Sequence, residues 1–383
     1  MKHNILFISS WYPTRINPTL GNFIFKHAEC ASIENNVRAL HVILDASSKK
    51  KIECETESQP FNSTVIYLRP YKIPILGKFF NYLRIIRTYI RELKKMKKNG
   101  FKPDLVHANI AYPIGFIAWI YKIKFKLNFV LEEHWTGYHD YANVKISWFK
   151  RKIIRFVSNK ALLILPDSED LGNAIKKFGV KTPFLALPNV ADVELFKPTE
   201  ANNDENTIKI VHVSTLIDKH KNISMLLDAF AKTLEKHPNI ELHIVTDGDI
   251  NFYNNQIDDL GIKNKIINHG CLGVEGVSQI MKNCDFFVLS SNYENLPCVL
   301  IESILCGTPV VSTNVGGVSE IINDENGILV PSKDLDALVL AIETMINKYK
   351  TYDKQKMHEN AVKKYSYQAI AKLLSSIYGK YVK

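Results

Sequence analysis

Residues 284–322 read CDFFVLSSNYENLPCVLIESILCGTPVVSTNVGGVSEII, and the order of elements in this stretch predicts the architecture of the chain. The apolar run Asp285–Leu289 has the length and composition of a fully buried strand, and a polar loop follows at 290–295. A helix is expected from Pro297, because proline lacks the N–H that the first helical position leaves unpaired. A second apolar strand follows at Val310–Thr313. Strand, loop, helix and strand in this order predict a parallel α/β unit.

Two carboxylates lie eight residues apart in this stretch, Glu294 in the loop and Glu302 inside an otherwise apolar helix. Burying an unpaired carboxylate is costly, so Glu302 requires hydrogen-bond donors. A neighbouring lysine or a backbone N–H would serve, and so would the two vicinal hydroxyls of a ribose. N–H groups around Asn295, Leu296 and Cys298, at the positive end of the helix, predict an anion site. A phosphate beside sugar hydroxyls describes a sugar nucleotide.

The pattern Glu294-x7-Glu302 is followed by Gly307-Thr308-Pro309-Val310-Val311 and by Gly316-Gly317-Val318-Ser319-Glu320. Together these motifs resemble the donor-site signature of retaining glycosyltransferases of family 4, and the resemblance extends over nearly the whole chain. It implies the α/β GT-B fold, in which two Rossmann-like domains with doubly wound parallel sheets face a cleft and a C-terminal helix crosses back to the first domain. The implied reaction moves a sugar from a nucleotide diphosphate to an acceptor hydroxyl with retention of anomeric configuration.

The same resemblance implies roles for residues of the donor site. Glu302 would hold the ribose, and Glu294 would orient the sugar hydroxyls. Lys221 and the start of the helix would neutralise the diphosphate. The residues at the helix start are Asn295, Leu296, Pro297 and Cys298. Thr215 stands where the family usually has an arginine, so Lys219 would supply the second positive charge.

Further roles follow from the resemblance for three loops. Gly270 and Leu272 would lie in a loop whose backbone reads the nucleotide base. Gly21 and Asn22 would lie over the donor phosphates and beside the acceptor, although a plain turn is the alternative for this loop. His134, which comes soon after an apolar strand, would lie near the donor sugar and the acceptor and would position or polarise them.

The motif Asp247-Gly248-Asp249 is a D-x-D, the metal-binding pattern of glycosyltransferases with the GT-A fold. Its position matches the Gly-Asp-Gly turn of GT-B enzymes, so a turn is expected and no metal site. No cofactor is expected beyond the nucleotide-sugar donor, either a UDP-sugar or a GDP-sugar. For His107 we expect a packed or solvated side chain rather than a site residue.

Composition narrows the class of protein. With 46% hydrophobic and 23% charged residues in 383, the chain is expected to form two soluble globular domains. Six cysteines without a C-x-x-C pair predict reduced thiols and a cytosolic protein. The first apolar segment, Ile5–Ile8, is too short for a signal peptide, and no uncharged run reaches membrane-spanning length. We therefore expect neither a secreted nor an integral membrane protein.

The charge is distributed unevenly along the chain. Residues 1–190 carry 30 Lys and Arg against 14 Asp and Glu, whereas residues 191–383 carry 19 against 25. A basic N-terminal half predicts contact with nucleic acid or with an anionic membrane, and the absence of nucleic-acid-binding motifs disfavours the former. The basic amphipathic stretches Tyr71–Lys98 and Trp148–Phe156 predict either solvated surface helices or helices that meet anionic lipid, and the second stretch favours lipid.

A polar run at Thr199–Thr207 places an interdomain linker at 191–206. It would join an N-terminal domain at 1–190 to a C-terminal domain at 207–364, with the terminal helix at 365–383. We predict a bacterial glycosyltransferase that acts on a lipid-linked or polysaccharide precursor, peripherally, on the cytoplasmic face of the membrane. Two alternatives belong to other classes. One is a GT-B epimerase that needs no acceptor, and the other is a sugar-nucleotide-binding protein without catalysis.

Overall fold

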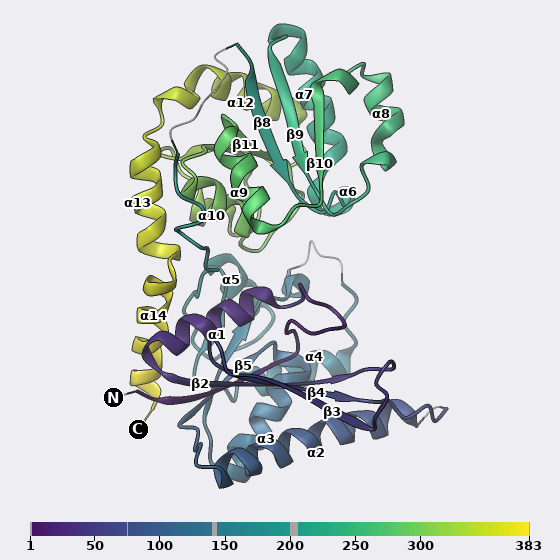
Figure 1. Cartoon of the computed structure of the whole chain (residues 1–383), viewed down its shortest axis with the longest axis vertical. Coiled ribbons are helices and arrows are strands. Elements are labelled where there is room, and N and C mark those ends of the chain that lie inside the picture. Colours follow the sequence, from purple (N-terminus) through teal and green to yellow (C-terminus); the bar gives the residue numbers. More distant parts are fainter. Residues whose placement is uncertain (1, 75, 140–143, 200–205, 383) are drawn as a thin grey trace. The chain divides into compact units, whose positions relative to one another are not determined.

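The computed structural model describes residues 2–74, 76–139, 144–199 and 206–382. The chain forms two compact units, one made of Met1–Val190 with Tyr367–Lys383 and the other of Ala191–Ser366 (Figure 1). Both units are built on a parallel sheet. The domain bounds given above stay a prediction, and residues 200–205 of the expected linker lie outside the described residues.

The first unit is a seven-stranded sheet with helices on both faces. Its strands are β1 (Asn4–Ser9), β2 (Asn36–Leu44), β3 (Ile52–Glu57), β4 (Asn62–Leu68), β5 (Leu105–Asn109), β6 (Phe129–Glu133) and β7 (Ile164–Pro166). Its helices are α1 (Asn22–Glu34), α2 (Gly77–Lys98), α3 (Phe116–Phe125), α4 (Trp148–Ser158), α5 (Glu169–Lys177) and α14 (Tyr367–Tyr381), with short turns η1 (Ala111–Gly115) and η2 (Thr136–Tyr138).

The strand order of this sheet is β3-β4-β2-β1-β5-β6-β7, and all neighbours are parallel except β3 and β4. Strands β5 and β6 are buried along their whole length, although each combines an apolar start with buried polar side chains, His107 and Asn109 in β5 and Glu132 and Glu133 in β6. Strand β3 is a polar, mostly exposed edge strand that pairs with one neighbour. The sequence did not lead us to expect this antiparallel edge, because its alternation of charge and small residues gives no strong apolar signal.

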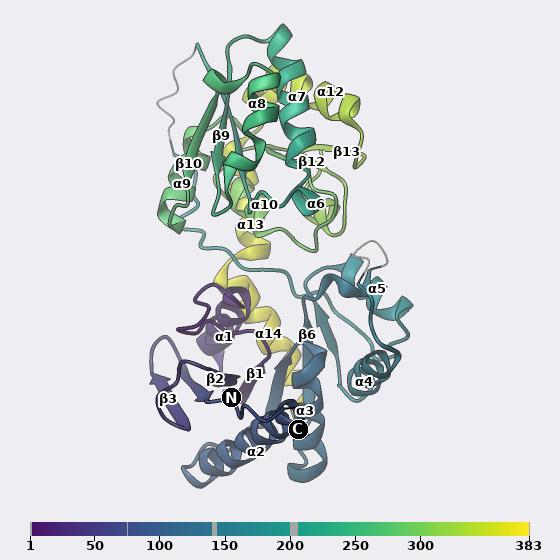
Figure 2. The same cartoon turned by 90° about the vertical axis from the view of Figure 1, so that its right-hand side faces the viewer.

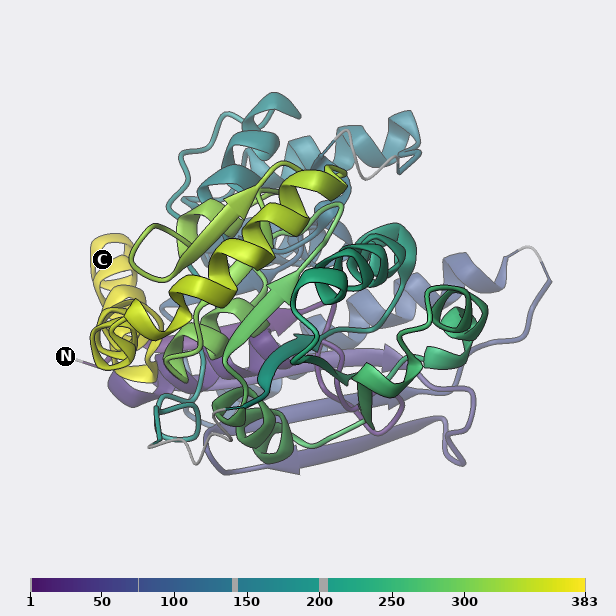
Figure 3. The same cartoon turned by 90° about the horizontal axis from the view of Figure 1, so that it is seen from above.

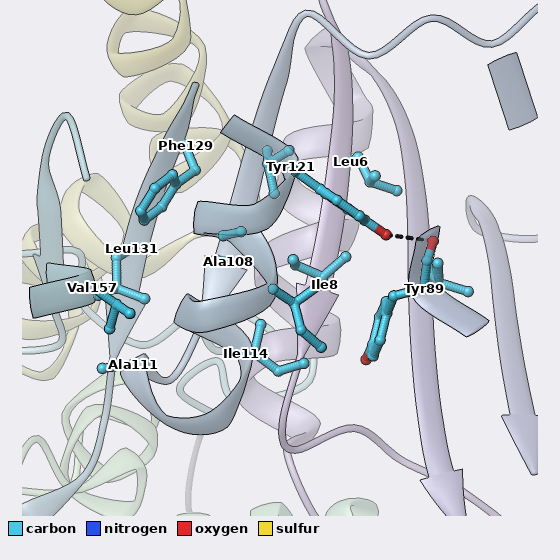
Figure 4. Packing of buried hydrophobic residues seen from close by; sticks show 14 of the residues in the cluster. Leu6, Ile8, Tyr89, Ala108, Ala111, Ile114, Tyr121, Phe129, Leu131 and Val157 are labelled. Atoms are coloured by element: carbon cyan, nitrogen blue, oxygen red, sulfur yellow. Dashed lines mark hydrogen bonds between the residues drawn. The ribbon is translucent and has the colours of Figure 1, made fainter. Parts of the chain in front are cut away.

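One face of the first sheet packs against α2, α3 and α4, and α3 contacts both of the others (Figure 2). Figure 4 shows Ile8 of β1 in this core together with Tyr89 of α2 and Tyr121 of α3. The Tyr121 hydroxyl donates to the Tyr89 carbonyl at 2.7 Å, so a fully buried polar group is satisfied. This packing fixes the strand ends from which the connecting loops leave.

The other face of the first sheet packs against α1 and the C-terminal helix α14. From α14, Leu374 and Tyr378 are buried among β1 residues such as Ile5 and Phe7. The last segment of the chain is thus part of the first unit's core rather than an appendage.

The second unit is a six-stranded sheet with helices on both faces. Its strands are β8 (Ile208–Val213), β9 (Ile240–Val245), β10 (Ile266–Gly270), β11 (Phe286–Leu289), β12 (Val310–Thr313) and β13 (Gly327–Val330). Its helices are α6 (Asp218–Lys221), α7 (Ile223–Lys236), α8 (Asn254–Asp259), α9 (Val274–Asn283), α10 (Cys298–Leu305), α11 (Val318–Ile321), α12 (Leu335–Lys348) and α13 (Lys354–Tyr365), with short turns η4 (Ile250–Tyr253), η5 (Lys263–Lys265) and η6 (Tyr349–Thr351).

All neighbouring strands of the second sheet are parallel, in the order β10-β9-β8-β11-β12-β13. Helices α7 and α12 lie side by side on one face (Figure 3), and α10 contacts α13 in a separate core. Helix α10 begins at Cys298, one residue later than predicted, because Pro297 has extended backbone angles and forms the N-cap.

The predicted α/β fold with two parallel, Rossmann-like halves is confirmed. Part of the predicted linker, however, is packed: Ala191 and Phe196, which precede the polar run at 199–207, are buried in the second unit's core that also contains α10. Within the described ranges, no helix combines the length and the apolar character needed to cross a membrane.

Candidate functional site

The loop between β11 and α10 places Glu294 beside Lys221. The Lys221 Nζ donates to Glu294 Oε1 at 2.5 Å, and the Ser291 hydroxyl donates to the same oxygen at 2.6 Å. Both charged side chains are mostly buried, with 19% of Lys221 and 11% of Glu294 exposed. Partial burial strengthens such a pair relative to one on an open surface. Two of the residues predicted for the donor site are therefore in direct contact.

Hydrogen bonds to the segment 217–222 hold this loop in place. The Asn292 N–H donates to the His220 carbonyl at 2.8 Å, and the Ser290 hydroxyl donates to the Lys221 carbonyl at 2.8 Å. The first bond joins the two backbones and the second joins the Ser290 side chain to the Lys221 backbone, so the Lys221–Glu294 contact does not depend on two flexible side chains alone. Thr215 and Lys219 are exposed nearby in the chain.

Gly316 and Gly317, which follow β12, also contact the loop that carries Glu294. The Gly317 N–H donates to the Asn295 carbonyl at 2.8 Å. Gly316 has φ +55°, and a Cβ built on it would lie 1.9 Å from the Glu294 carbonyl oxygen. Only glycine fits here, because the backbone is left-handed and the backbone of Glu294 passes too close to leave room for a side chain.

Glu302 lies half-buried in the middle of α10, whose other side packs into the core through Leu300, Ile301 and Leu305. Among the residues predicted for the helix start, Leu296 is buried and Cys298 opens the helix after Pro297. The α10 N-terminus, the Glu294 loop and Glu302 thus belong to one continuous stretch of the second unit.

The remaining second-unit predictions fall on loops at strand ends. Gly270 ends β10 with φ +65° and has open space around its Cβ position, and Leu272 follows it half-buried. The Asp247-Gly248-Asp249 segment is a bend in which the Gly248 N–H donates to Thr246 Oγ1 at 2.8 Å. The chain therefore bends at this segment, and the expectation of a turn rather than a metal site stays a prediction.

In the first unit, Gly21 is the left-handed N-cap of α1, and Asn22 is the first residue of this helix. A Cβ on Gly21 would lie 2.5 Å from the Trp11 carbonyl carbon, so the helix start lies directly against the loop that leaves β1. The next residue, Phe23, packs its ring 4.2 Å from the His134 ring, centroid to centroid. Two of the predicted regions of this unit are thus neighbours.

His134 belongs to a buried charged cluster that the sequence did not reveal. Its Nε2 lies 2.5 Å from Glu132 Oε1. His27 Nδ1 lies 2.7 Å from the same oxygen, and His107 Nε2 lies 2.7 Å from Glu132 Oε2. His107 is packed, one of the two outcomes expected for it. The signal for this cluster in the sequence was weak. His27 lies on a helix far along the chain from the other residues, and only the pair of carboxylates Glu132-Glu133 at the end of a strand is unusual.

Glu133, the other carboxylate at the end of β6, organises the following loop. It accepts from the Ala111 N–H at 2.9 Å, from the Tyr138 hydroxyl at 2.8 Å and from the Trp135 N–H at 3.1 Å. Burial raises the pKa of Glu133, and these donors oppose that rise. Glu133 therefore anchors the loop from Trp135 to Tyr138, while Glu132 faces the histidines.

Three side chains in the described part of the chain have the types and proximity needed to hold a metal. His27, Glu132 and His134 present ligand atoms within 4.8 Å of one another. The nitrogen–oxygen separations of 2.7 and 2.5 Å are hydrogen-bond distances. Two donors on one tetrahedral zinc ion lie farther apart, about 3.3 Å. The distances therefore fit hydrogen bonds from the histidines to Glu132 rather than shared coordination of a metal ion. The expectation that no metal is needed stays a prediction.

Two family descriptions match consecutive parts of this chain. Residues 194–364 match Glycosyl transferases group 1, and residues 40–195 match Glycosyltransferase Family 4. With the two parallel-sheet units, these matches define a glycosyltransferase of the GT-B fold. The chain belongs to glycosyltransferase family 4.

Two curated relatives and one crystal structure illustrate the match. One relative, from the phosphatidylinositol N-acetylglucosaminyltransferase of Arabidopsis thaliana, is 27% identical over 79% of this chain, and the match spans 66% of that protein. TuaC of Bacillus subtilis (strain 168), a glycosyltransferase assigned provisionally to teichuronic acid biosynthesis, is 26% identical over 88% of each chain. HepE of Anabaena, crystallised with UDP, has a TM-score of 0.77 at 19% identity over 99% of this chain and 100% of its own, which shows the fold alone.

Proposed function

We propose that this protein transfers a sugar from a UDP- or GDP-sugar to a hydroxyl of a lipid-linked or polysaccharide precursor, with retention of anomeric configuration. The observation that carries the proposal is the Glu294 carboxylate, paired with Lys221 and Ser291 on a loop that continues into α10 and Glu302. We infer the class of acceptor from the names of two relatives. One is a subunit of a phosphatidylinositol N-acetylglucosaminyltransferase, and the other is assigned provisionally to the biosynthesis of teichuronic acid.

In the proposed reaction, the bond between the anomeric carbon and the diphosphate oxygen breaks while a bond to the acceptor oxygen forms, and the acceptor hydroxyl gives its proton to the departing diphosphate. Negative charge then grows on the diphosphate. Lys221 and the N-terminus of α10 would stabilise that charge, and preorganised donors of this kind often supply the largest catalytic contribution. Glu294 would accept hydrogen bonds from the sugar hydroxyls, and Glu302 from the ribose. Gly270 and Leu272 would contact the base.

The first unit would supply the acceptor side of the reaction through Gly21, Asn22 and His134. The contact of Phe23 with His134 supports this grouping, because it brings the start of α1 beside the strand end that carries the histidine.

The direct test uses a panel of radiolabelled UDP- and GDP-sugars, each incubated with and without a membrane lipid extract. Label in the lipid fraction supports the transferase. Altered free donor without acceptor would support an epimerase instead. Binding without turnover would identify the third class, a sugar-nucleotide-binding protein, which Thr215 in place of the family's arginine favours as the second candidate.

The ribose role of Glu302 leads to a quantitative prediction. Replacing Glu302 with Gln should raise the dissociation constant of the nucleotide about 10- to 100-fold, because a charge-assisted hydrogen bond contributes about 1.5–3 kcal/mol. Calorimetry with the nucleotide and with its 2′-deoxy analogue provides the control. The variant should discriminate less between the two ligands than the wild type does, and equal discrimination would exclude the ribose role.

A second part of the proposal is contact of the first unit with an anionic membrane. In α4, Trp148 and Phe149 are 69% and 67% exposed, and Lys152 Nζ lies 3.8 Å from the centroid of the Trp148 ring. In α2 only the first turn exposes aromatic residues, Phe79 and Phe80, since the rest of its apolar face packs on the sheet. Exposed aromatic rings among Lys and Arg side chains are typical of helices that lie in a lipid interface.

We predict that Trp148→Ala with Phe149→Ala reduces binding to vesicles of equal parts phosphatidylglycerol and phosphatidylcholine at least about fivefold. Raising NaCl from about 0.05 M to about 0.5 M should release the wild type, because screening weakens the attraction of basic residues to anionic lipid. Phe252→Ala is the matched control, since Phe252 is 86% exposed but lies in the acidic second unit. Equal loss of binding in both variants, or salt-insensitive binding, would exclude this contact.

A further inference from the structure

Glu132 is a carboxylate with no exposed surface whose two oxygens meet three imidazoles. His27 comes from α1, His107 from β5 and His134 from the end of β6, so three separate elements converge on it. Each nitrogen–oxygen distance lies between 2.5 and 2.7 Å. Such a centre is costly to bury unless every charge is compensated.

The second nitrogen of each imidazole also has a partner within the first unit. His134 Nδ1 lies 3.5 Å from the buried Asp167 Oδ2. His27 Nε2 lies 3.0 Å from the Pro188 carbonyl oxygen. His107 Nδ1 lies 2.7 Å from the Tyr378 hydroxyl of α14. The three rings therefore have different outer partners, which decides how many protons each ring carries.

Carboxylate and carbonyl oxygens only accept hydrogen bonds. His134 lies between two carboxylates, and His27 lies between a carboxylate and a carbonyl, so both nitrogens of both rings must donate. Each of these rings is then an imidazolium. Their two positive charges balance the negative charges of Glu132 and Asp167, and the buried cluster is neutral overall.

His107 differs because its outer partner is a hydroxyl, which can donate. A neutral His107 donates from Nε2 to Glu132 and accepts the Tyr378 proton at Nδ1. Burial lowers the pKa of His107 and raises the pKa of Tyr378, so both groups stay neutral. The C-terminal helix thereby fixes the tautomer of His107 and supplies Glu132 with a further donor.

We propose that Glu132 and Asp167 are positioning residues that hold His134 as a permanent imidazolium, and that Tyr378 supports them through His107. This inference rests on the proposed function, in which His134 serves the transfer reaction. An imidazolium with both nitrogens bound to carboxylates cannot act as a general base. His134 would therefore act by its fixed positive charge and not by taking the acceptor proton.

The charged groups around His134 together raise its pKa. Burial disfavours the charged ring, but the bonds to Asp167 and Glu132 outweigh it and raise the pKa of His134 to about 10. Burial would also raise the pKa of Glu132, yet His27 and the bonds from the histidines lower it well below its usual range. Glu133 adds a neighbouring carboxyl, whose oxygen accepts from the His134 N–H. The imidazolium should thus persist throughout the neutral range and be lost only as the pH approaches 10.

The test is long-range proton–nitrogen NMR of the full chain labelled with 15N-histidine, recorded from about pH 5.5 to about pH 9.5. In the wild type, both His134 nitrogens should remain protonated up to about pH 9. Asp167→Asn should lower the titration midpoint of His134 by about one to three pH units, since an opposite charge shifts a pKa by that amount. His41 is the internal control, because burial lowers its pKa to about 4 and its Nδ1 contacts the Ser9 carbonyl instead.

Three results would overturn the inference: a neutral His134 at pH 7.5 in the wild type, an unchanged midpoint in Asp167→Asn, or a stoichiometric divalent cation in the purified protein by elemental analysis. Glu132→Gln should act in the same direction as Asp167→Asn. Because Glu132 is fully buried and its variant can fail to fold, Tyr378→Phe provides a milder third variant. It removes one hydroxyl and should alter the pH dependence of the His107 signals.

The readouts separate this inference from the proposed function. If NMR shows the imidazolium but no sugar is transferred, only the proposed function fails. If transfer occurs with a neutral His134, only the inference fails. In an active enzyme, Asp167→Asn should lower kcat about tenfold or more at pH 8 and leave KM for the donor nearly unchanged, with activity recovering at lower pH as His134 regains its proton. A loss of kcat that is the same at every pH would indicate a merely structural role.

Discussion

Replacing Gly316 with Ala should abolish donor binding, with a dissociation constant for the nucleotide raised more than about 100-fold. The added Cβ would lie 1.9 Å from the Glu294 carbonyl oxygen and 2.9 Å from its carbonyl carbon, so the loop must move. The left-handed backbone of Gly316 adds strain of about 1–2 kcal/mol for a residue with a side chain. Displacing the loop separates Glu294 from Lys221 and shifts the start of α10. Calorimetric titration with UDP and GDP measures this effect.

Gly261→Ala is the matched control for this prediction. Gly261 has φ +67° and lies in the same unit, but nothing lies within 4 Å of its Cβ position. The control therefore carries the backbone strain without the collision and should lose only about 1–2 kcal/mol of stability, with donor affinity retained. If Gly316→Ala binds the nucleotide as tightly as Gly261→Ala does, the turn at Gly316 does not position the donor loop.

Lys221→Met should lower kcat/KM for transfer about 100- to 1,000-fold, the loss typical of removing one preorganised donor from a developing negative charge. The second unit has no arginine, so lysines must carry the charge that the family's arginine usually supplies. The variant also leaves the mostly buried Glu294 carboxylate with Ser291 but without its ammonium partner. Steady-state kinetics with the donor found in the radiolabel panel measures the loss.

Lys219→Met and a double-variant cycle complete this experiment. Lys219 is exposed two residues away, so its substitution tests which lysine neutralises the diphosphate. If Lys219→Met costs more than Lys221→Met, the role belongs to Lys219. Combining Lys221→Met with Glu294→Gln should cost clearly less than the sum of the two single effects, because the residues act as a unit. Additive losses would show that the observed contact has no part in the reaction.

Much of the second unit could be predicted from its sequence. β12 has the predicted bounds, and β11 and α10 each begin one residue later than expected. Local signals sufficed here, because apolar runs of strand length alternate with a proline-capped helix and a glycine turn. The contact between Lys221 and Glu294 had no local signal, since the two residues are 73 positions apart. The family resemblance placed both residues in the donor site but did not predict their contact.

The first unit shows where such reasoning stops. Strand β3 went unpredicted because its sequence is polar and only pairing with β4 makes it a strand. In the second unit, the burial of Phe196 within the predicted linker likewise depends on a core assembled from distant helices. For the basic stretch Tyr71–Lys98, the sequence left open a solvated surface helix or a helix that meets anionic lipid, and the structure shows that the sheet covers most of its apolar face.

The sequence by itself determined the order of strand, loop, helix and strand at 285–313 and the uneven distribution of charge, because these follow from the types of residue along a short segment. Only the tertiary structure decided which buried charges meet. His107 and Tyr378 are 271 positions apart, His27 and Glu132 are 105 positions apart, and each residue looks ordinary in its own segment. Their protonation states follow from which donors and acceptors surround each ring, and that arrangement exists only when the sheet and the C-terminal helix pack together.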